Sequence, residues 1–272
     1  MKGSITLVSL AVASVVSART FTVKNSCSYT VWPAMFTDLN VGSALPDQPT
    51  GYISAYFPDI SINNSPFCSW EAPAGSSVTF NVPDNWTAGR IWPRTECDFS
   101  TNPGPNSCAT GGCNGGLLCD PHTGTGVPPA TVAEFTLSGG GTTDNYDVSL
   151  VDGFNVPTTV TNNVGCGVPS CPVDLNANCP SELAVHDASG NVAGCDSSCK
   201  ANLDGNPANS PNCCSGSFDV PATCPSSGVA FYDYFKSACP NSYAYAYDES
   251  SGTALWDCDS SLGADFTITF CG

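Results

Sequence analysis

Positive charge is scarce in this sequence. Of its 272 residues only seven are Lys or Arg, against 24 Asp or Glu, and the formal net charge is -17. A surface this acidic repels nucleic acid and anionic membranes, so electrostatic binding to either is disfavoured. A neutral polysaccharide is not excluded by this charge.

Long hydrophobic runs are also missing. The N-terminal segment carries Lys2 and an apolar run from Ile5 to Val16, and no later segment is apolar enough to cross a membrane. The run is too short for a bilayer core of about 30 Å and has the features of a secretory signal peptide. We therefore expect residues 1–18 to be removed and the protein to be secreted, to the extracellular space or cell wall, without a membrane span.

Several catalytic and metal-binding motifs are absent. The chain has no Gly-x-Ser-x-Gly sequence, no Gly-x-x-x-x-Gly-Lys-Ser/Thr loop and no Cys-x-x-Cys pair. Its two histidines, His122 and His186, lie in turn-rich stretches and are interpreted as solvated side chains. We expect no metal and no cofactor.

Cysteine, in contrast, is abundant. Seventeen cysteines follow the signal segment, and they fit an oxidising compartment and a disulfide framework better than metal sites. Nine of them lie between Cys166 and Cys239, where apolar runs are short, so disulfides are expected to stabilise what burial cannot. Since the number is odd, one cysteine must be left over, and spacing alone does not give the pairing.

Alternating apolar and polar residues predict strands. This pattern begins at Phe21 and at Val78, occurs on both sides of the Gly-rich turn in "TVAEFTLSGGGTTDNYDVSL", and returns in the C-terminal "FTITF". We expect a β-sandwich built from N-terminal, middle and C-terminal segments, with two disulfide-linked excursions. One helix is predicted over 226–240, with an aromatic stripe that packs on the disulfides or, alternatively, forms a carbohydrate platform.

Two aspartates raise a question about the segment "YDVSLVDGFNVP", 146–157. On a regular strand Asp152 would share an apolar face with Val148 and Leu150, opposite to Asp147. A lone buried carboxylate is costly, so the regular strand cannot continue through Asp152. We expect a bend near Gly153, which has the required backbone freedom.

Several motifs together resemble the thaumatin-like family, also called pathogenesis-related group five. They are "GRIWPRTECDF", "CNGGLLC", "VAEFTL", "YDVSLVDGFNVP", "CPSEL", "YFKSACPNSYAYAYD" and "FTITFC", and they cover nearly the whole mature chain. The resemblance implies a mainly β protein, a thaumatin-like β-sandwich with a disulfide-rich second domain and a small disulfide-bonded loop domain. The implied ranges are 19–95 with 122–165 and 249–272 for the sandwich, 96–121 for the small loop, and 166–248 for the disulfide-rich domain with one helix.

The resemblance also implies eight disulfides and leaves Cys68 unpaired, either as a buried thiol or as a partner for an intermolecular bond. Asn85 and Asn63 are candidate glycosylation sites by their Asn-x-Ser/Thr pattern. The implied pairs are Cys27–Cys271, Cys97–Cys108, Cys113–Cys119, Cys166–Cys258, Cys171–Cys239, Cys179–Cys195, Cys199–Cys213 and Cys214–Cys224.

An acidic cleft between the two main domains is the third implication. The family's five cleft residues match Arg90, Glu134, Asp147, Asp152 and Asp248. Crowded carboxylates raise one another's pKa, so one can serve as general acid while another is ionised, as glycoside hydrolysis requires. We expect Glu134 as acid and Asp152 as base, with the other three residues binding substrate.

The expected protein is thus a monomer that binds β-1,3-glucan and hydrolyses it weakly as an endo-β-1,3-glucanase. A carboxyl separation of about 6.5–9.5 Å would indicate inversion, and about 5 Å retention. Two alternatives stay open: a non-enzymatic antifungal or wall-binding defence protein, and a charge cluster that only joins the domains. Sweet taste, known for the family's namesake, is disfavoured by the acidic surface.

Overall fold

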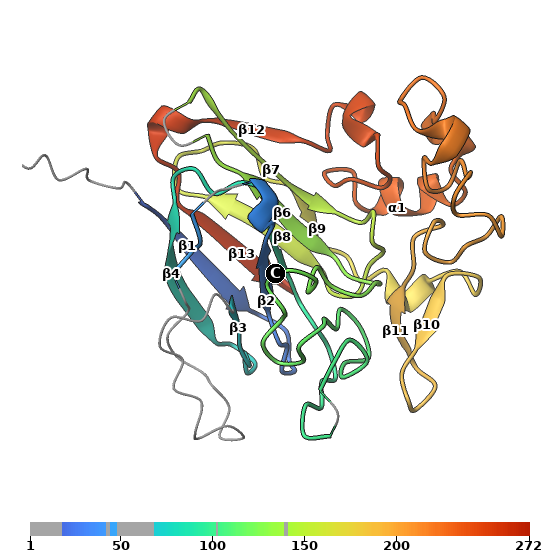
Figure 1. Cartoon of the computed structure of the whole chain (residues 1–272), viewed down its shortest axis with the longest axis horizontal. Coiled ribbons are helices and arrows are strands. Elements are labelled where there is room, and N and C mark those ends of the chain that lie inside the picture. The colour runs from blue at the N-terminus through green and yellow to red at the C-terminus, as the bar shows by residue number, and fades with distance from the viewer. Residues whose placement is uncertain (1–17, 42–43, 48–67, 102, 139–140) are drawn as a thin grey trace, which may run out of the picture.

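Two β-sheets form the body of the protein (Figure 1). The computed structural model describes residues 18–41, 44–47, 68–101, 103–138 and 141–272. The five-stranded sheet has the order β4 (Ser77–Pro83), β1 (Ala18–Asn25), β13 (Phe266–Phe270), β8 (Thr158–Asn162) and β9 (Ser170–Cys171). The six-stranded sheet has the order β12 (Trp256–Asp259), β7 (Thr143–Ser149), β6 (Val132–Thr136), β5 (Gly89–Trp92), β2 (Ala34–Thr37) and β3 (Cys68–Ser69).

The alternation in the sequence becomes alternating burial in β1 and β13. Phe21 and Val23 point into the core, and β1 runs parallel to β13 with Phe21 opposite Phe266. Parallel neighbours must come from distant segments, and this pairing places the first and last strands of the described chain side by side. The predicted mainly β sandwich is confirmed.

Aromatic rings join the two sheets. Phe21 and Phe266 of the five-stranded sheet contact Phe135 of β6, with ring centroids 4.8 Å and 5.4 Å apart. Trp86 stacks on the same ring at 5.9 Å. Edge and stacked contacts of this kind add to the hydrophobic stabilisation of a core. This cluster packs one face of the six-stranded sheet against the five-stranded sheet and leaves the other face for charged side chains.

The hairpin β6–β7 and the predicted bend are both present. Strand β7 ends at Ser149, and the amide of Gly153 donates to the carbonyl of Leu150 at 2.9 Å. Gly153 has φ of +89°, which favours glycine because other residues are strained there. Leu150 stays in the core while Asp152 turns out of it.

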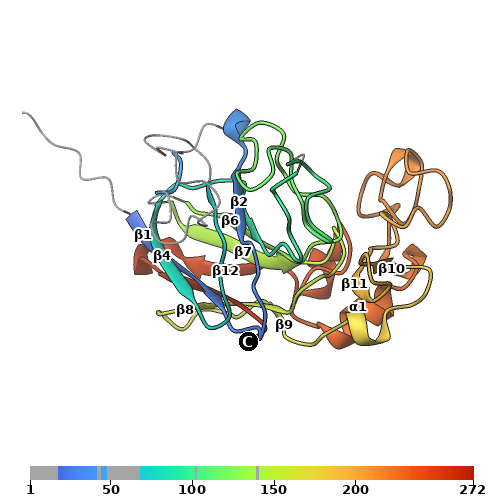
Figure 2. The ribbon, with the colours of Figure 1, turned by 90° about the horizontal axis from the view of Figure 1, so that it is seen from below.

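The disulfide-rich region lies at one end of the sandwich in both views (Figure 1, Figure 2). It contains the hairpin β10 (Ala184–His186) and β11 (Val192–Cys195) and the helix α1 (Tyr232–Ala238). Among the described residues no helix has the length and apolarity needed to span a membrane. Short 3-10 turns are η1 (Leu39–Val41), η2 (Asn176–Asn178), η3 (Gly216–Phe218), η4 (Ser226–Gly228), η5 (Asp248–Ser251) and η6 (Ser260–Leu262).

Helix α1 is shorter than the predicted range 226–240. Phe231 has φ of +57°, a left-handed conformation that separates the helix from the preceding turn η4. Phe235 is buried, and Phe231 and Tyr234 pack partly buried against the core. The aromatic stripe therefore packs inward, and the alternative of a carbohydrate platform is not supported. Strand β9 also differs from expectation, because it lies in the range 166–248 yet pairs with β8 of the sandwich.

Eight disulfides link the chain. They join the same eight pairs that the family resemblance implies, use sixteen of the seventeen cysteines and leave Cys68. Cys68 belongs to β3, opposite Met35, but its side chain lies outside the described residues, as does all of Asn63. The state of that thiol stays a prediction.

Arg94 fastens the small disulfide loop to the sandwich. Its guanidinium is buried and donates to the carbonyls of Trp32, Gly116 and Leu117 at 2.8–3.0 Å. Burial lowers its pKa to about 9. Three carbonyl acceptors are needed because a buried cation without them would be strongly destabilising.

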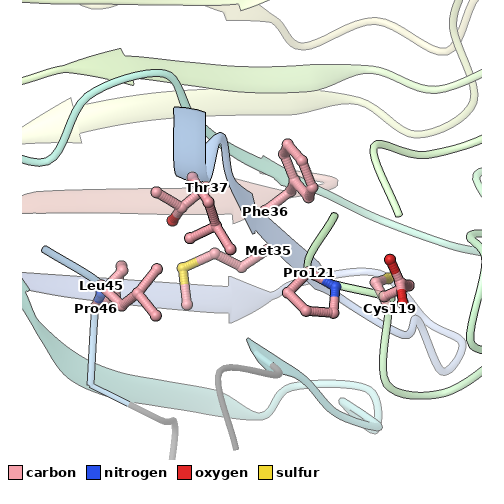
Figure 3. Close-up of a pocket in the computed structure, with 9 residues that line it drawn as sticks. Met35, Phe36, Thr37, Leu45, Pro46, Cys119 and Pro121 are labelled. Atoms are coloured by element: carbon pink, nitrogen blue, oxygen red, sulfur yellow. The ribbon is translucent and has the colours of Figure 1, made fainter. Parts of the chain in front are cut away.

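A small hollow lies between β2 and this loop. Figure 3 shows Met35 extending toward Leu45 and Pro46, with Pro121 and, beyond it, Cys119 on the other side. Its volume is about 10 Å³, which is room for roughly one water molecule. This hollow is therefore a packing feature and not a ligand site.

Candidate functional site

A row of three charges crosses three neighbouring strands of the six-stranded sheet. Arg90 of β5 is directly opposite Glu134 of β6, which is directly opposite Asp147 of β7. Directly opposite residues share a face of the sheet. Their chain neighbours Ile91 and Val148 are fully buried in the core, so the charged row lies on the other face.

Asp152 joins this row from the turn after β7. Arg90 Nε lies 2.9 Å from Glu134 Oε1, and Arg90 Nη1 lies 3.7 Å from Asp152 Oδ2. Lys200 Nζ lies 3.5 Å from Asp152 Oδ1. The carboxylate of Asp152 is thus placed between two cations, one from the sandwich and one from the disulfide-rich region.

Lys200 was not among the residues expected at the site. It follows Cys199 in a loop whose approach to the sandwich is set by a backbone bridge, in which Phe154 and Cys195 exchange hydrogen bonds of 2.7 Å. Nothing in the sequence near Lys200 marks it as a partner of Asp152. Only the docking of the two regions brings them together.

The charged row forms the floor of an open cleft of about 500 Å³. This volume lies in the usual range for ligand sites. Both the sandwich and the segment 243–255 contribute walls, so the cleft lies at the junction of the two regions. Its lining residues are Ala88, Gly89, Arg90, Glu134, Phe135, Thr136, Asn145, Asp147, Ser149, Val151, Asp152, Tyr243, Ala246, Glu249 and Leu255.

Two carboxyl groups of the row hold their protons more tightly than usual. Burial raises the pKa of Glu134, with a further rise from Asp152, while Arg90 lowers it. The pKa of Asp147 lies well above its ordinary value because of burial and the neighbouring Glu134. Among the described residues Asp147 Oδ1 is buried without a hydrogen-bond partner. The Glu134–Asp147 pair therefore retains a proton at a pH where exposed carboxyl groups have lost theirs.

Tyr243 and Glu249 also line the cleft. Burial and the carboxylates of Asp147 and Glu249 raise the pKa of Tyr243, so its hydroxyl stays neutral and can donate a hydrogen bond. Neither residue was predicted for the site. Tyr243 is held next to the charged row by the bridge between Ser149 and Tyr243, which links β7 to this segment.

Asp248 does not line the cleft and corrects the expectation that it contacts substrate. Its side chain is fully buried and accepts from Lys236 Nζ, Tyr232 Oη and the amide of Ala244, each at 2.9 Å. All three donors belong to the disulfide-rich region, and together they satisfy both carboxylate oxygens of Asp248. Asp248 thus organises the loop that presents Glu249, its neighbour in the chain, to the cleft.

The remaining sequence features lie away from the cleft. His122 and His186 are both exposed, and Asn85 is exposed in the turn after β4. Within the described ranges no group of His, Cys, Asp or Glu is arranged to hold a metal ion. Glycan attachment at Asn85 stays a prediction.

Comparison with known proteins identifies the relatives of this chain. The Thaumatin family matches residues 25–272. Pathogenesis-related protein 5 of Arabidopsis thaliana is 39% identical over 260 residues, covering 94% of this chain and 91% of that protein. A protein of Prunus avium named glucan endo-1,3-beta-glucosidase is 37% identical over 258 residues, covering 93% and 91%.

A solved structure shares the fold at much lower identity. The GH family 64 laminaripentaose-producing beta-1,3-glucanase from Paenibacillus barengoltzii, complexed with laminarihexaose, has a TM-score of 0.55 and 12% identity, covering 93% of this chain and 74% of that one. At this identity the likeness shows the fold alone. The family match, the 37–39% identity over almost the whole chain and the eight disulfides agree, and this protein belongs to the thaumatin family.

Proposed function

We propose that this protein is secreted, binds β-1,3-glucan in the acidic cleft and hydrolyses it slowly as an endo-β-1,3-glucanase. The observation that carries the proposal is the raised pKa of Glu134 in an open cleft, beside a second carboxylate, Asp152, that faces two cations. The name of the Prunus avium relative supports the same substrate. Eight disulfides favour an oxidising, extracellular setting.

The proposed chemistry assigns one proton transfer to each carboxyl group. Protonated Glu134 donates its proton to the glycosidic oxygen as the bond to the anomeric carbon breaks. Asp152 accepts a proton from the water molecule that forms the new bond to that carbon. Arg90 contacts both carboxyl groups and fixes their orientation, while Tyr243 and Glu249 hydrogen-bond sugar hydroxyls.

The decisive experiment compares wild type with Glu134→Gln. Reducing-sugar release from linear β-1,3-glucan is expected to fall by about 10²–10⁴-fold, the usual contribution of a general acid. Binding to insoluble glucan in a parallel pull-down is expected to persist, because glutamine keeps the shape of the side chain. Equal hydrolysis by both proteins would remove Glu134 from the mechanism.

Binding without hydrolysis, as in a wall-binding defence protein, is the second candidate. It is favoured by the close contact between Arg90 Nε and Glu134 Oε1, since this ion pair stabilises the carboxylate form that cannot donate a proton. In that case wild type and Glu134→Gln would both bind insoluble glucan and neither would release sugar. The same assay therefore separates the two candidates.

A further inference from the structure

A second hollow, here named the aromatic hollow, lies where the sandwich meets the disulfide-rich region. Its volume is about 510 Å³, as large as the cleft, and no described residue lines both. Five separate segments of the chain contribute described lining residues, including the strand β11 and the turn η2. Its lining residues are Tyr29, Thr30, Trp32, Thr95, Glu96, Asn155, Asn176, Val192 and Ala193.

Two aromatic side chains stand on a rigid part of the backbone at this hollow. Tyr29 is 47% exposed and Trp32 is partly exposed. The backbone of Trp32 exchanges hydrogen bonds with that of Arg94 at 3.0 Å and 3.2 Å, and Asn25 Nδ2 donates to the carbonyl of Tyr29 at 2.8 Å. The backbone that carries both rings is thus held by hydrogen bonds, and the exposed parts of the rings offer an apolar surface to a ligand.

Glu96 gives the hollow a hydrogen-bond acceptor. It has φ of +50°, a left-handed conformation that is uncommon outside glycine and concentrates at functional sites. Among the described residues its carboxylate has no hydrogen bond or ion pair. Burial raises the pKa of Tyr29, and the negative charges of Asp174 and Glu96 raise it further.

Amide side chains form the inner end of the hollow. Asn155 is buried and donates to the carbonyl of Pro93 and to Thr110, at 2.9 Å and 3.0 Å. Asn176 donates in turn to the carbonyl of Asn155 at 2.9 Å, which ties the disulfide-rich region to the sandwich. The hollow therefore has a fixed polar end and an aromatic outer wall.

This combination matches the chemistry of a sugar ring. The faces of a pyranose present C–H groups that pack on aromatic rings, and its edges present hydroxyl donors that a carboxylate accepts. None of the described residues that line the hollow is Lys or Arg, and the negative charge of Glu96 opposes an anionic ligand. We propose that the aromatic hollow is a second glycan-binding site, which holds a short neutral segment of polysaccharide against Tyr29 and Trp32 with Glu96 accepting from its hydroxyls.

Two sites on one protein would strengthen attachment to a polymer. A chain or wall surface that occupies both the cleft and the aromatic hollow binds the second site intramolecularly, which raises the overall affinity without new contacts. The second site rests on the proposed function only in the choice of a glucan as one of the probes. It does not depend on hydrolysis.

The test first disables binding in the cleft by substitution and then substitutes residues of the aromatic hollow. The double variant Arg90→Gln/Glu134→Gln is titrated with laminarihexaose, cellohexaose and xylohexaose by calorimetry and by tryptophan fluorescence. We expect binding of at least one neutral hexaose with a fluorescence change. Adding Tyr29→Ala should weaken that binding about tenfold, whereas Tyr29→Phe should change it by less than about twofold. Trp32→Phe should abolish the fluorescence change.

Three results would overturn the proposal. In the first, the cleft variant binds none of the hexaoses. In the second, it binds them equally well with and without Tyr29→Ala. In the third, it binds a protonated glucosamine hexamer more tightly than the neutral hexaoses, which would indicate a cation site. Thermal unfolding confirms that each variant is folded. If the cleft changes leave glucan binding intact while Tyr29→Ala reduces it, the proposed function fails and the second site stands.

Discussion

Glu134 and Asp147 lie directly opposite each other on β6 and β7, so two carboxyl side chains share one face at the floor of the cleft. Like charges placed directly opposite on a sheet are destabilising. The pair is retained beside one arginine, Arg90, which contacts Glu134 but leaves Asp147 Oδ1 without a partner within the described part of the chain. Such a pair binds a proton more tightly than a single exposed carboxyl group would.

Asp147→Asn tests this coupling through stability. The folded pKa of Asp147 is raised, so the folded state binds more protons than the unfolded state once the pH exceeds the ordinary value of about 3.9. The free energy of unfolding therefore falls as the pH rises from about 3.9 to the raised pKa of Asp147. The variant should be more stable than wild type at pH 7 by about 1 kcal/mol, or about 2–4 °C in Tm, and equal to it near pH 3.

The control for that experiment is Asp257→Asn, an exposed residue of β12. It should leave the pH dependence of Tm unchanged. If the Tm values of wild type and Asp147→Asn instead change in parallel from pH 3 to pH 7, the assignment of a raised pKa to Asp147 is contradicted.

Arg90→Gln is predicted to move the pH profile of hydrolysis upward. Arg90 lowers the pKa of both Glu134 and Asp147, so its loss should raise both. If Glu134 acts in its protonated form, the alkaline limb of kcat/KM shifts to higher pH, even though the rate falls because the carboxyl groups lose their orientation. Arg90→Lys keeps the charge and should shift the limb less. If the alkaline limb of kcat/KM moves in neither variant, the effect of Arg90 on the pKa of Glu134 is excluded.

Lys236→Met should be strongly destabilising. It leaves the fully buried Asp248 with an uncompensated charge, and breaking a buried pair in this way costs about 3–5 kcal/mol. The matched control is Lys200→Met, which removes an ion pair whose side chains are 41% and 29% exposed. An exposed pair contributes about 0–1 kcal/mol. Chemical denaturation of the two variants measures the difference, and equal losses would contradict the distinction.

Gly153→Ala should affect both stability and the cleft. A methyl group at this position would lie 2.6 Å from the carbonyl oxygen of Cys195 and would have to adopt φ of +89°. Strain of this kind costs about 1–3 kcal/mol. Because Cys195 and Phe154 join the two regions, the backbone shift should also displace Asp152 and weaken glucan binding. The control is Gly190→Ala, which also has positive φ, at +85°, but has open space around it, so it should lose stability without loss of binding.

The sequence predicted most of the fold for identifiable reasons. Alternation at Phe21 and Val78 has a period of two, which only a strand with one buried face explains. The bend at Gly153 was predictable because Asp152 could not remain on the face of Leu150. The length of α1 was not, since the left-handed conformation of Phe231 depends on packing around it and has no local sequence signal.

By itself the sequence determined the mainly β class and the presence of a disulfide framework, because periodicity and cysteine content are local properties. Its resemblance to the thaumatin-like family added the disulfide pairs and four of the cleft residues. Tertiary structure alone decided that Lys200 faces Asp152 and that Asp248 is buried while Glu249 lines the cleft. It also brought Tyr29, Trp32 and Glu96 to one hollow. These relationships join residues far apart in the chain, and burial and charge pairing depend on which segments pack together, which no local pattern encodes.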